Sequence, residues 1–146
     1  PPRRSPQAAS RLVELGAPDL IAAHLATTAN PLPGAIGLAH LCDAFRAAAS
    51  ASIDAGALAS LIAFLDARPP SPAHVAVAVS TAIGAIANAS EATANTVAKS
   101  GALQAMVERT LLAKRRPPAE ALILARAAII KALERCTEYE PLVALL

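Results

Sequence analysis

Apolar residues recur along most of this chain at intervals of three and four, the spacing that places them on one side of an α-helix. The clearest example is a stripe of four large residues in the middle of the chain: Val75, Val79, Ile83 and Ile86. Valine and alanine alternate over residues 75–79, as in a strand, but alanine is a poor strand former and the helical spacing continues beyond them. We therefore expect helix there. Longer helices are predicted over the proline-free stretches 35–49, 73–89 and 119–135, and shorter ones over 10–15 and 91–99.

Three sequence features recur in the same order along the chain: a glycine, an apolar pattern and a proline-bearing break. Glycine followed by alanine occurs at positions 40 and 45 residues apart, namely Gly16, Gly56 and Gly101. An apolar pattern follows each, and then a proline-bearing break, at Pro31, Pro69 and Pro117. Glycine ends a helix by taking a left-handed conformation, and proline ends one because it lacks an amide donor. The predicted unit is a short helix, a glycine turn, a second helix, a proline loop and a longer helix. A unit of about 40 residues cannot bury its apolar stripe alone, so the units must stack.

With these landmarks the chain resembles the armadillo repeat family, most closely over residues 53–65 and 81–103, where Gly-Ala-Leu stands at 56–58 and 101–103. The resemblance implies an all-α, right-handed α-solenoid that forms a single armadillo-like domain over residues 1–146. About three repeats are expected, near 7–47, 48–90 and 91–136, with 137–146 as the start of a truncated fourth. HEAT repeats, which usually lack the glycine-terminated short helix, are the near alternative. Because the chain ends on the apolar Leu145 and Leu146, we expect a fragment of a longer solenoid or an end that a partner covers.

The resemblance also implies a non-catalytic scaffold or adaptor, whose third helices line a concave groove for a protein partner such as an extended peptide or a neighbouring subunit. Polar residues on the predicted third helices are the candidate contacts: His40, Asp43, His74, Thr81, Asn88, Lys131, Glu134 and Arg135. His74, Thr81 and Asn88 recur at seven and share one face of their helix. The alternative is that these residues are the solvated faces of three helices. The chain has no Trp, so the tryptophan and asparagine array that holds basic peptides in importin-type members is not implied.

Composition narrows the partner class. Of the 146 residues, 39 are alanine and 55% are hydrophobic, which favours close helix packing. The net charge of +2 is too small to make nucleic acid the expected partner. The longest apolar run, residues 75–87, is shorter than the roughly 18 to 20 residues that a membrane span needs.

Two cysteines do not make a disulfide framework, so a reducing compartment is expected. We expect a cytoplasmic protein, with a cilium, the cytoskeleton or an organelle lumen such as the mitochondrion as alternatives.

Candidate chemistry is sparse. His40 and Cys42 are two apart on a predicted helix, which points them to opposite sides and prevents joint metal ligation. Cys42 and Cys136 are predicted to be structural thiols in the helix core. Neither a Cys-x-x-Cys, a His-Glu-x-x-His nor a Gly-x-Ser-x-Gly motif is present. The formal sequon at residues 88–90 is predicted to be a helix end with a polar cap. We therefore expect no enzyme and no cofactor.

A second functional hypothesis is a structural subunit buried in a large multiprotein assembly, such as a ciliary or organellar complex. The low charge of the chain and its apolar C-terminal end favour this version. An enzymatic function would need a site contributed by residues outside this segment.

Overall fold

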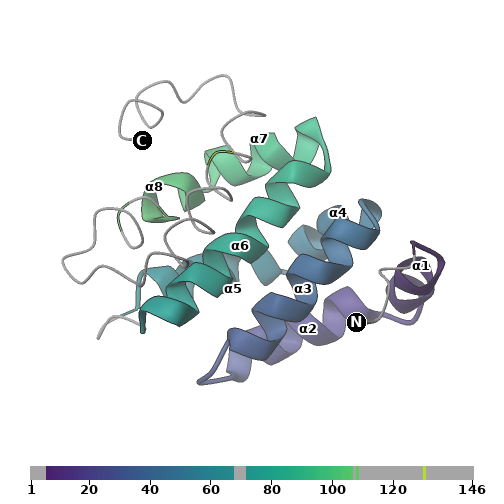
Figure 1. Ribbon diagram of the computed structural model, residues 1–146, viewed down its shortest axis with the longest axis horizontal. Helices are drawn as coiled ribbons and strands as arrows, with labels where there is room; N and C mark the ends of the chain where they lie inside the picture. The colour runs from purple at the N-terminus through teal and green to yellow at the C-terminus, as the bar shows by residue number, and fades with distance from the viewer. Residues whose placement is uncertain (1–5, 68–71, 107, 109–129, 131–146) are drawn as a thin grey trace.

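The computed structural model describes residues 6–67, 72–106, 108 and 130, and the regular structure in this part of the chain is helical. The predicted all-α class is therefore confirmed. Figure 1 shows the helices in chain order: α1 Pro6–Glu14, α2 Ala17–Thr27, α3 Leu32–Ala44, α4 Ala47–Asp54, α5 Ala57–Leu65, α6 Ala73–Ala89, α7 Glu91–Lys99 and α8 Ala102–Met106. The helices predicted over 73–89 and 91–99 have the predicted bounds. The predicted helix 119–135 lies outside the described residues.

Three glycines adopt the same left-handed conformation at the same place in the helix order. Gly16, Gly56 and Gly101 have φ of 86°, 92° and 82°, and within the described residues no other residue type has positive φ. Each stands between a short helix and the next helix, where its carbonyl accepts an N–H bond four residues ahead, at 3.1, 3.3 and 3.2 Å. A residue with a Cβ is strained in this region because its side chain approaches the following carbonyl. The predicted glycine turns are confirmed.

The helix predicted over residues 35–49 is wrong at its C-terminal end. α3 ends at Ala44, Phe45 is extended with φ −147° and ψ 107°, and α4 begins at Ala47. The break has no glycine or proline, so the sequence carries no local stop signal there. Phe45 is instead half-buried against the hydrophobic core, while α4 turns to pack on α1, α2 and α6. Tertiary packing therefore overrides a locally helical sequence.

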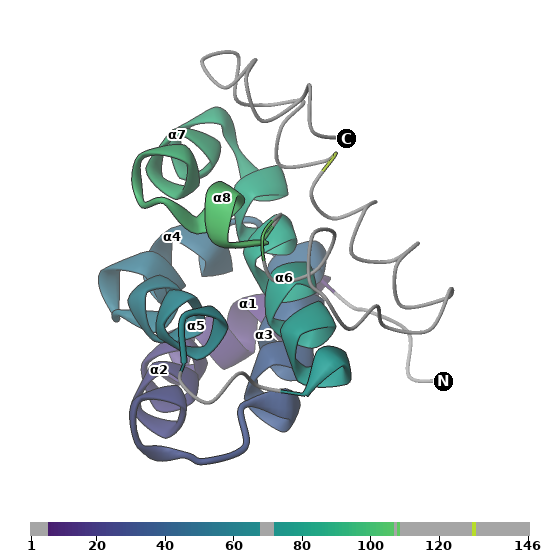
Figure 2. The same cartoon turned by 90° about the vertical axis from the view of Figure 1, so that its left-hand side faces the viewer.

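The helices form two layers. α3 and α6 lie side by side and make the most extensive contact between any two described helices. In Figure 2, α2, α5 and α8 follow one another in a column beside them, and α2 contacts α5 as α5 contacts α8. α2, α5 and α8, which share one place in the predicted unit, thus follow one another in contact along the chain.

Small side chains let these helices approach closely. Several core alanines are fully buried, together with large residues such as Leu38, Leu61, Ile83 and Ile86. Gly34 of α3 lies directly on α2, because a Cβ at this position would meet Leu25 Cδ2 at 3.0 Å. Dense packing of this kind leaves little space for larger residues.

Two glycine substitutions separate backbone strain from packing. Gly56→Ala should destabilise the fold by about 1–2 kcal/mol, because alanine is strained at φ 92° although its Cβ meets nothing within 4 Å. Gly37→Ala, in the exposed middle of α3 with equally open space, should stabilise it by about 0.5–1 kcal/mol. Urea unfolding followed by circular dichroism measures both free energies. Equal effects of the two substitutions would contradict the left-handed turn at Gly56.

Candidate interaction surface

On each of the two longest described helices, a stripe of exposed and half-buried residues lies opposite a buried side. On α3 the stripe recurs at four, three and four: Pro33, Gly37, His40 and Ala44. On α6 it recurs at four, three, four and three: His74, Ala78, Thr81, Ala85 and Asn88. Of these, Ala44 and the last four residues of the α6 stripe are half-buried, and the remainder are exposed. We call the two stripes together the α3–α6 ladder.

The predicted contact residues on α6 lie on this open side. Val79, Ile83 and Ile86, on the opposite side, are 0% exposed. The Thr81 hydroxyl donates to the carbonyl of Val77 at 2.8 Å, within the same helix. Thr81 therefore presents its methyl group and an acceptor lone pair rather than a free donor.

On α3, the predicted contact residues His40 and Asp43 are both exposed. Because α3 and α6 pack side by side, the structure brings these two residues onto the helix next to His74, Thr81 and Asn88 (Figure 1). The remaining candidates, Lys131, Glu134 and Arg135, lie outside the described residues.

His40 and Cys42 separate as predicted, with His40 exposed and Cys42 only 2% exposed in the core. Burial raises the pKa of the Cys42 thiol to about 12, the Asp43 charge adds to the rise, and a hydrogen bond with Ser52 opposes it. A thiol with this pKa is neutral at physiological pH, so it packs as a small hydrophobe. The structural reading of Cys42 is confirmed, and Cys136 lies outside the described residues.

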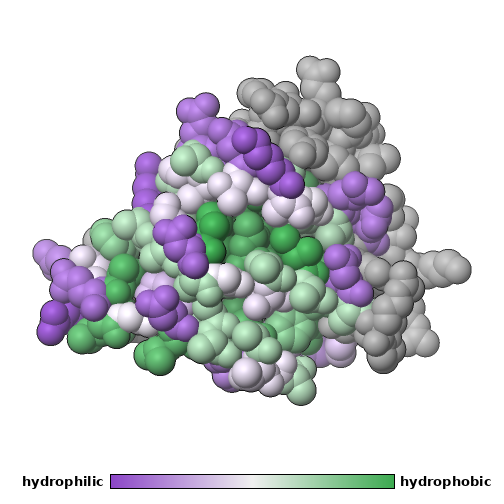
Figure 3. All heavy atoms as spheres, turned by 180° about the vertical axis from the view of Figure 1, so that it is seen from behind, coloured by the Kyte–Doolittle hydropathy of each residue, from purple (hydrophilic) through white to green (hydrophobic). Residues whose placement is uncertain are grey.

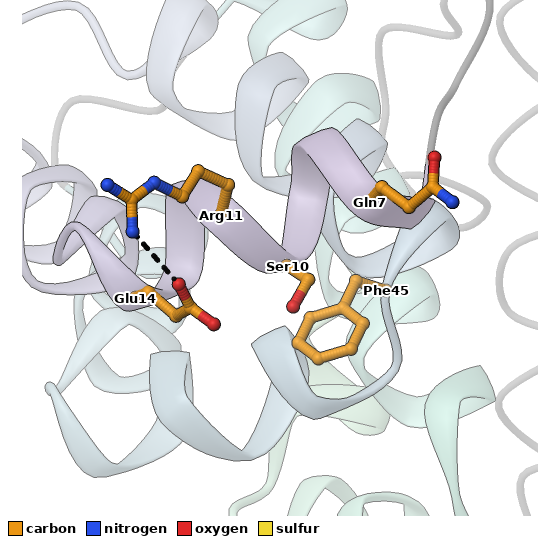
Figure 4. A pocket seen from close by; sticks show the side chains of 5 residues that line it. All are labelled: Gln7, Ser10, Arg11, Glu14 and Phe45. Atoms are coloured by element: carbon orange, nitrogen blue, oxygen red, sulfur yellow. Dashed lines mark hydrogen bonds and ion pairs between the residues drawn. The ribbon is translucent and has the colours of Figure 1, made fainter.

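One open pocket, of about 390 Å³, lies away from the ladder positions, between α1 and the end of α3. Its lining is four α1 residues and one aromatic ring: Gln7, Ser10, Arg11, Glu14 and Phe45 (Figure 4). Arg11 Nη1 donates to Glu14 Oε2 at 3.1 Å, and both side chains are more than 60% exposed, so this ion pair contributes little to stability. Sequence reasoning missed the pocket. The spacing of the four α1 residues is a signal for a common face, but the approach of Phe45 depends on the break after α3.

The polar cap predicted at the sequon is present. The Ser90 side chain accepts from the Thr93 N–H at 3.1 Å, and the Ser90 N–H donates back to the Thr93 hydroxyl at 3.1 Å. These two reciprocal hydrogen bonds satisfy the backbone N–H groups of Ser90 and Thr93 at the start of α7. Asn88 is half-buried in the last turn of α6. The segment is a helix junction.

In the described part of the chain, no group of three or more His, Cys, Asp or Glu residues could hold a metal ion. None of the described helices is by itself long and apolar enough to cross a membrane; α4 and α5 reach that composition only together, and they are bent by 75°.

Comparison with known proteins finds no matching family model, curated protein or solved structure.

The burial of Cys42 predicts both the reactivity of its thiol and a pH dependence of the unfolding free energy. In a Cys136→Ser background, which leaves Cys42 as the single thiol, we expect no reaction with a disulfide reagent at pH 8 in the folded protein and full reaction in denaturant. Folding favours the neutral thiol, so its contribution to stability is complete below pH 9.0 and is lost as pH rises toward about 12.

The unfolding free energy of this variant should therefore fall more steeply over that pH range than that of the same chain with Cys42→Ala. Urea unfolding at several pH values gives both slopes. Rapid labelling of the folded protein at pH 8, or identical slopes, would show that Cys42 is not buried.

Proposed function

We propose that this chain is a non-catalytic protein-interaction element built of armadillo-like repeats in a right-handed solenoid, and that the α3–α6 ladder is its partner-binding groove. One observation carries the proposal. The two longest described helices pack along each other and carry stripes of exposed and half-buried residues at matching positions, so each further unit would extend the same surface.

The repeat assignment is supported by the three left-handed glycines and by contacts between equivalent helices, α1 with α4, α2 with α5, and α3 with α6. In a stack, each unit contacts its neighbours through the same faces, so contacts recur with the period of the sequence. α6 has 17 residues and α3 has 13, and this difference contributes to the increase of the glycine spacing from 40 to 45 residues.

The chemistry of the ladder favours a protein partner. Its positions alternate between small side chains, such as Gly37, Ala78 and Ala85, and uncharged polar ones, such as Thr81 and Asn88. Small residues let a partner backbone approach the helices, and the polar residues can bond to its amide groups. A polyanion would need a concentrated basic surface, and the two stripes carry no Lys or Arg.

A second candidate is a structural subunit of a large assembly. It is favoured by the face opposite α3 and α6, where an apolar band crosses the middle of the surface and hydrophilic residues border it (Figure 3). Apolar patches of this kind on a surface mark contacts with other proteins.

Site-specific photocrosslinking distinguishes the two surfaces. A photoreactive residue at position 37 or 78, on the ladder, should crosslink to a partner protein in cells that express the chain. The matched controls are positions 23 and 63, exposed alanines on α2 and α5. Crosslinks confined to the controls would favour the assembly role and contradict a groove on α3 and α6.

Affinity for the partner identified in this way gives the quantitative test. His40→Glu combined with Thr81→Glu should weaken binding by about tenfold or more, because central interface residues contribute on the order of 1–2 kcal/mol each. Ala23→Glu combined with Ala63→Glu should leave the affinity unchanged. Unfolding midpoints of both variants check that the fold is intact, and equal weakening by both pairs would contradict the proposal.

A further inference from the structure

α1 carries an apolar stripe that faces away from the core. Ala8 and Leu12 on the helix and Leu15, the residue directly after it, recur at four and three, and all three are exposed, Leu12 at 49% and Leu15 at 62%. The inward side of the same helix is formed by Ala9, which is 5% exposed, and by Val13, which is half-buried. α1 is therefore apolar on two sides, and only one of them is covered by the described helices.

The positions of Ala8 and Leu12 are covered in both later short helices. Forty residues after Ala8 and Leu12 come Ala48 and Ser52 of α4, each 0% exposed. In α7 the matching residues are Thr93 and Val97, at 3% and 0%. Ser52 bonds to Cys42 of α3, so this face of α4 lies against a helix of the preceding unit. The counterparts of Leu15 differ, because Ala55 is half-buried and Ser100 is exposed. The side of α1 that carries Ala8 and Leu12 is thus the one that α4 and α7 use for helix packing.

The charges beside the stripe are self-complementary. Arg11 and Glu14 are three residues apart on one flank of α1 and pair with each other at 3.1 Å (Figure 4). A two-fold axis near Leu12 would bring a second α1 alongside in the antiparallel sense. Such an axis places the small Ala8 opposite Leu15 of the other copy and brings Arg11 near the Glu14 of that copy. A two-fold interface requires this kind of self-matching surface.

We propose that a second copy of this chain packs on α1, forming an antiparallel α1–α1 dimer with Leu12 at its centre and Leu15 against Ala8 of the other copy. One helix from each copy makes a small interface, of the class that associates weakly and reversibly. The dimer leaves the α3–α6 ladder out of its interface, so it would join two interaction elements back to back and raise their effective affinity for a partner with repeated sites.

Sedimentation velocity over a range of protein concentrations tests the association. The wild-type chain should shift from monomer toward twice the monomer mass as concentration rises into the micromolar range and above. A wild-type chain that stays monomeric up to millimolar concentration overturns the proposal, and so does assembly that continues beyond the dimer into larger species.

Leu15→Glu places a charge against Ala8 of the other copy and should abolish the dimer without loss of fold, since the Leu15 side chain is already exposed. The matched control is Ile36→Glu near the start of α3, where the isoleucine is 46% exposed. Ile36 lies eight residues, about 12 Å of helix, before the end of α3, next to which Phe45 approaches α1. The control should dimerise like the wild type. A dimer that survives Leu15→Glu, or is lost in both variants, overturns the proposed seam.

A charge exchange tests the two-fold geometry itself. Arg11→Glu and Glu14→Arg should each weaken self-association, because each variant brings like charges together across the axis. Mixing the two variants should restore a dimer, since each copy then offers the charge that the other lacks. Failure of the mixture to associate overturns the antiparallel pairing. The crosslinking result on the ladder is independent of this outcome.

Discussion

Close packing of small side chains between neighbouring helices is the constraint on which the rest of the structure depends. α3 approaches α2 at Gly34, where even a methyl group would meet Leu25 at 3.0 Å, and fully buried alanines fill the core around the larger aliphatic residues. No described unit could bury its apolar side alone, because its helices are short and its side chains are small. Stability must therefore come from contacts between helices that are far apart in the sequence, above all between α3 and α6.

The left-handed glycines fix three of the turns in the described part of the chain. Each of them lies between a short helix and the next one, in a gap of two residues, and its carbonyl accepts an N–H bond from the helix that follows. The α3–α6 ladder lies on two other helices, which pack side by side and bury their opposite sides.

The two surfaces proposed for binding have different physical origins. The ladder is the outward side of helices whose other side is deeply buried, so it is a rigid surface of small and uncharged polar groups. The stripe on α1 is a packing face that the described helices leave uncovered, with an ion pair on its flank. The first suits a partner recognised through its backbone and amide groups, and the second suits another apolar helix. Dimerisation on α1 and binding on the ladder are therefore compatible.

Much of the helical structure could be predicted from the sequence, because it depends on local signals. The periodicity over residues 73–89 and the serine before residue 91 define α6 and α7, and the glycines at 16, 56 and 101 mark left-handed turns. The armadillo resemblance and the groove residues on the third helices remain proposals that rest on this local pattern.

Other features were decided only by the tertiary structure. The chain breaks at Phe45 because that ring and α4 pack on other helices, although the local sequence favours continued helix. The same break brings Phe45 beside α1 and creates a pocket that no spacing in the sequence predicts. Leu12 and Ile83 look alike as apolar residues at helical spacing, yet one is half exposed and the other fully buried. Periodicity determines which residues share a side of a helix, whereas the neighbours that cover that side come from distant parts of the chain.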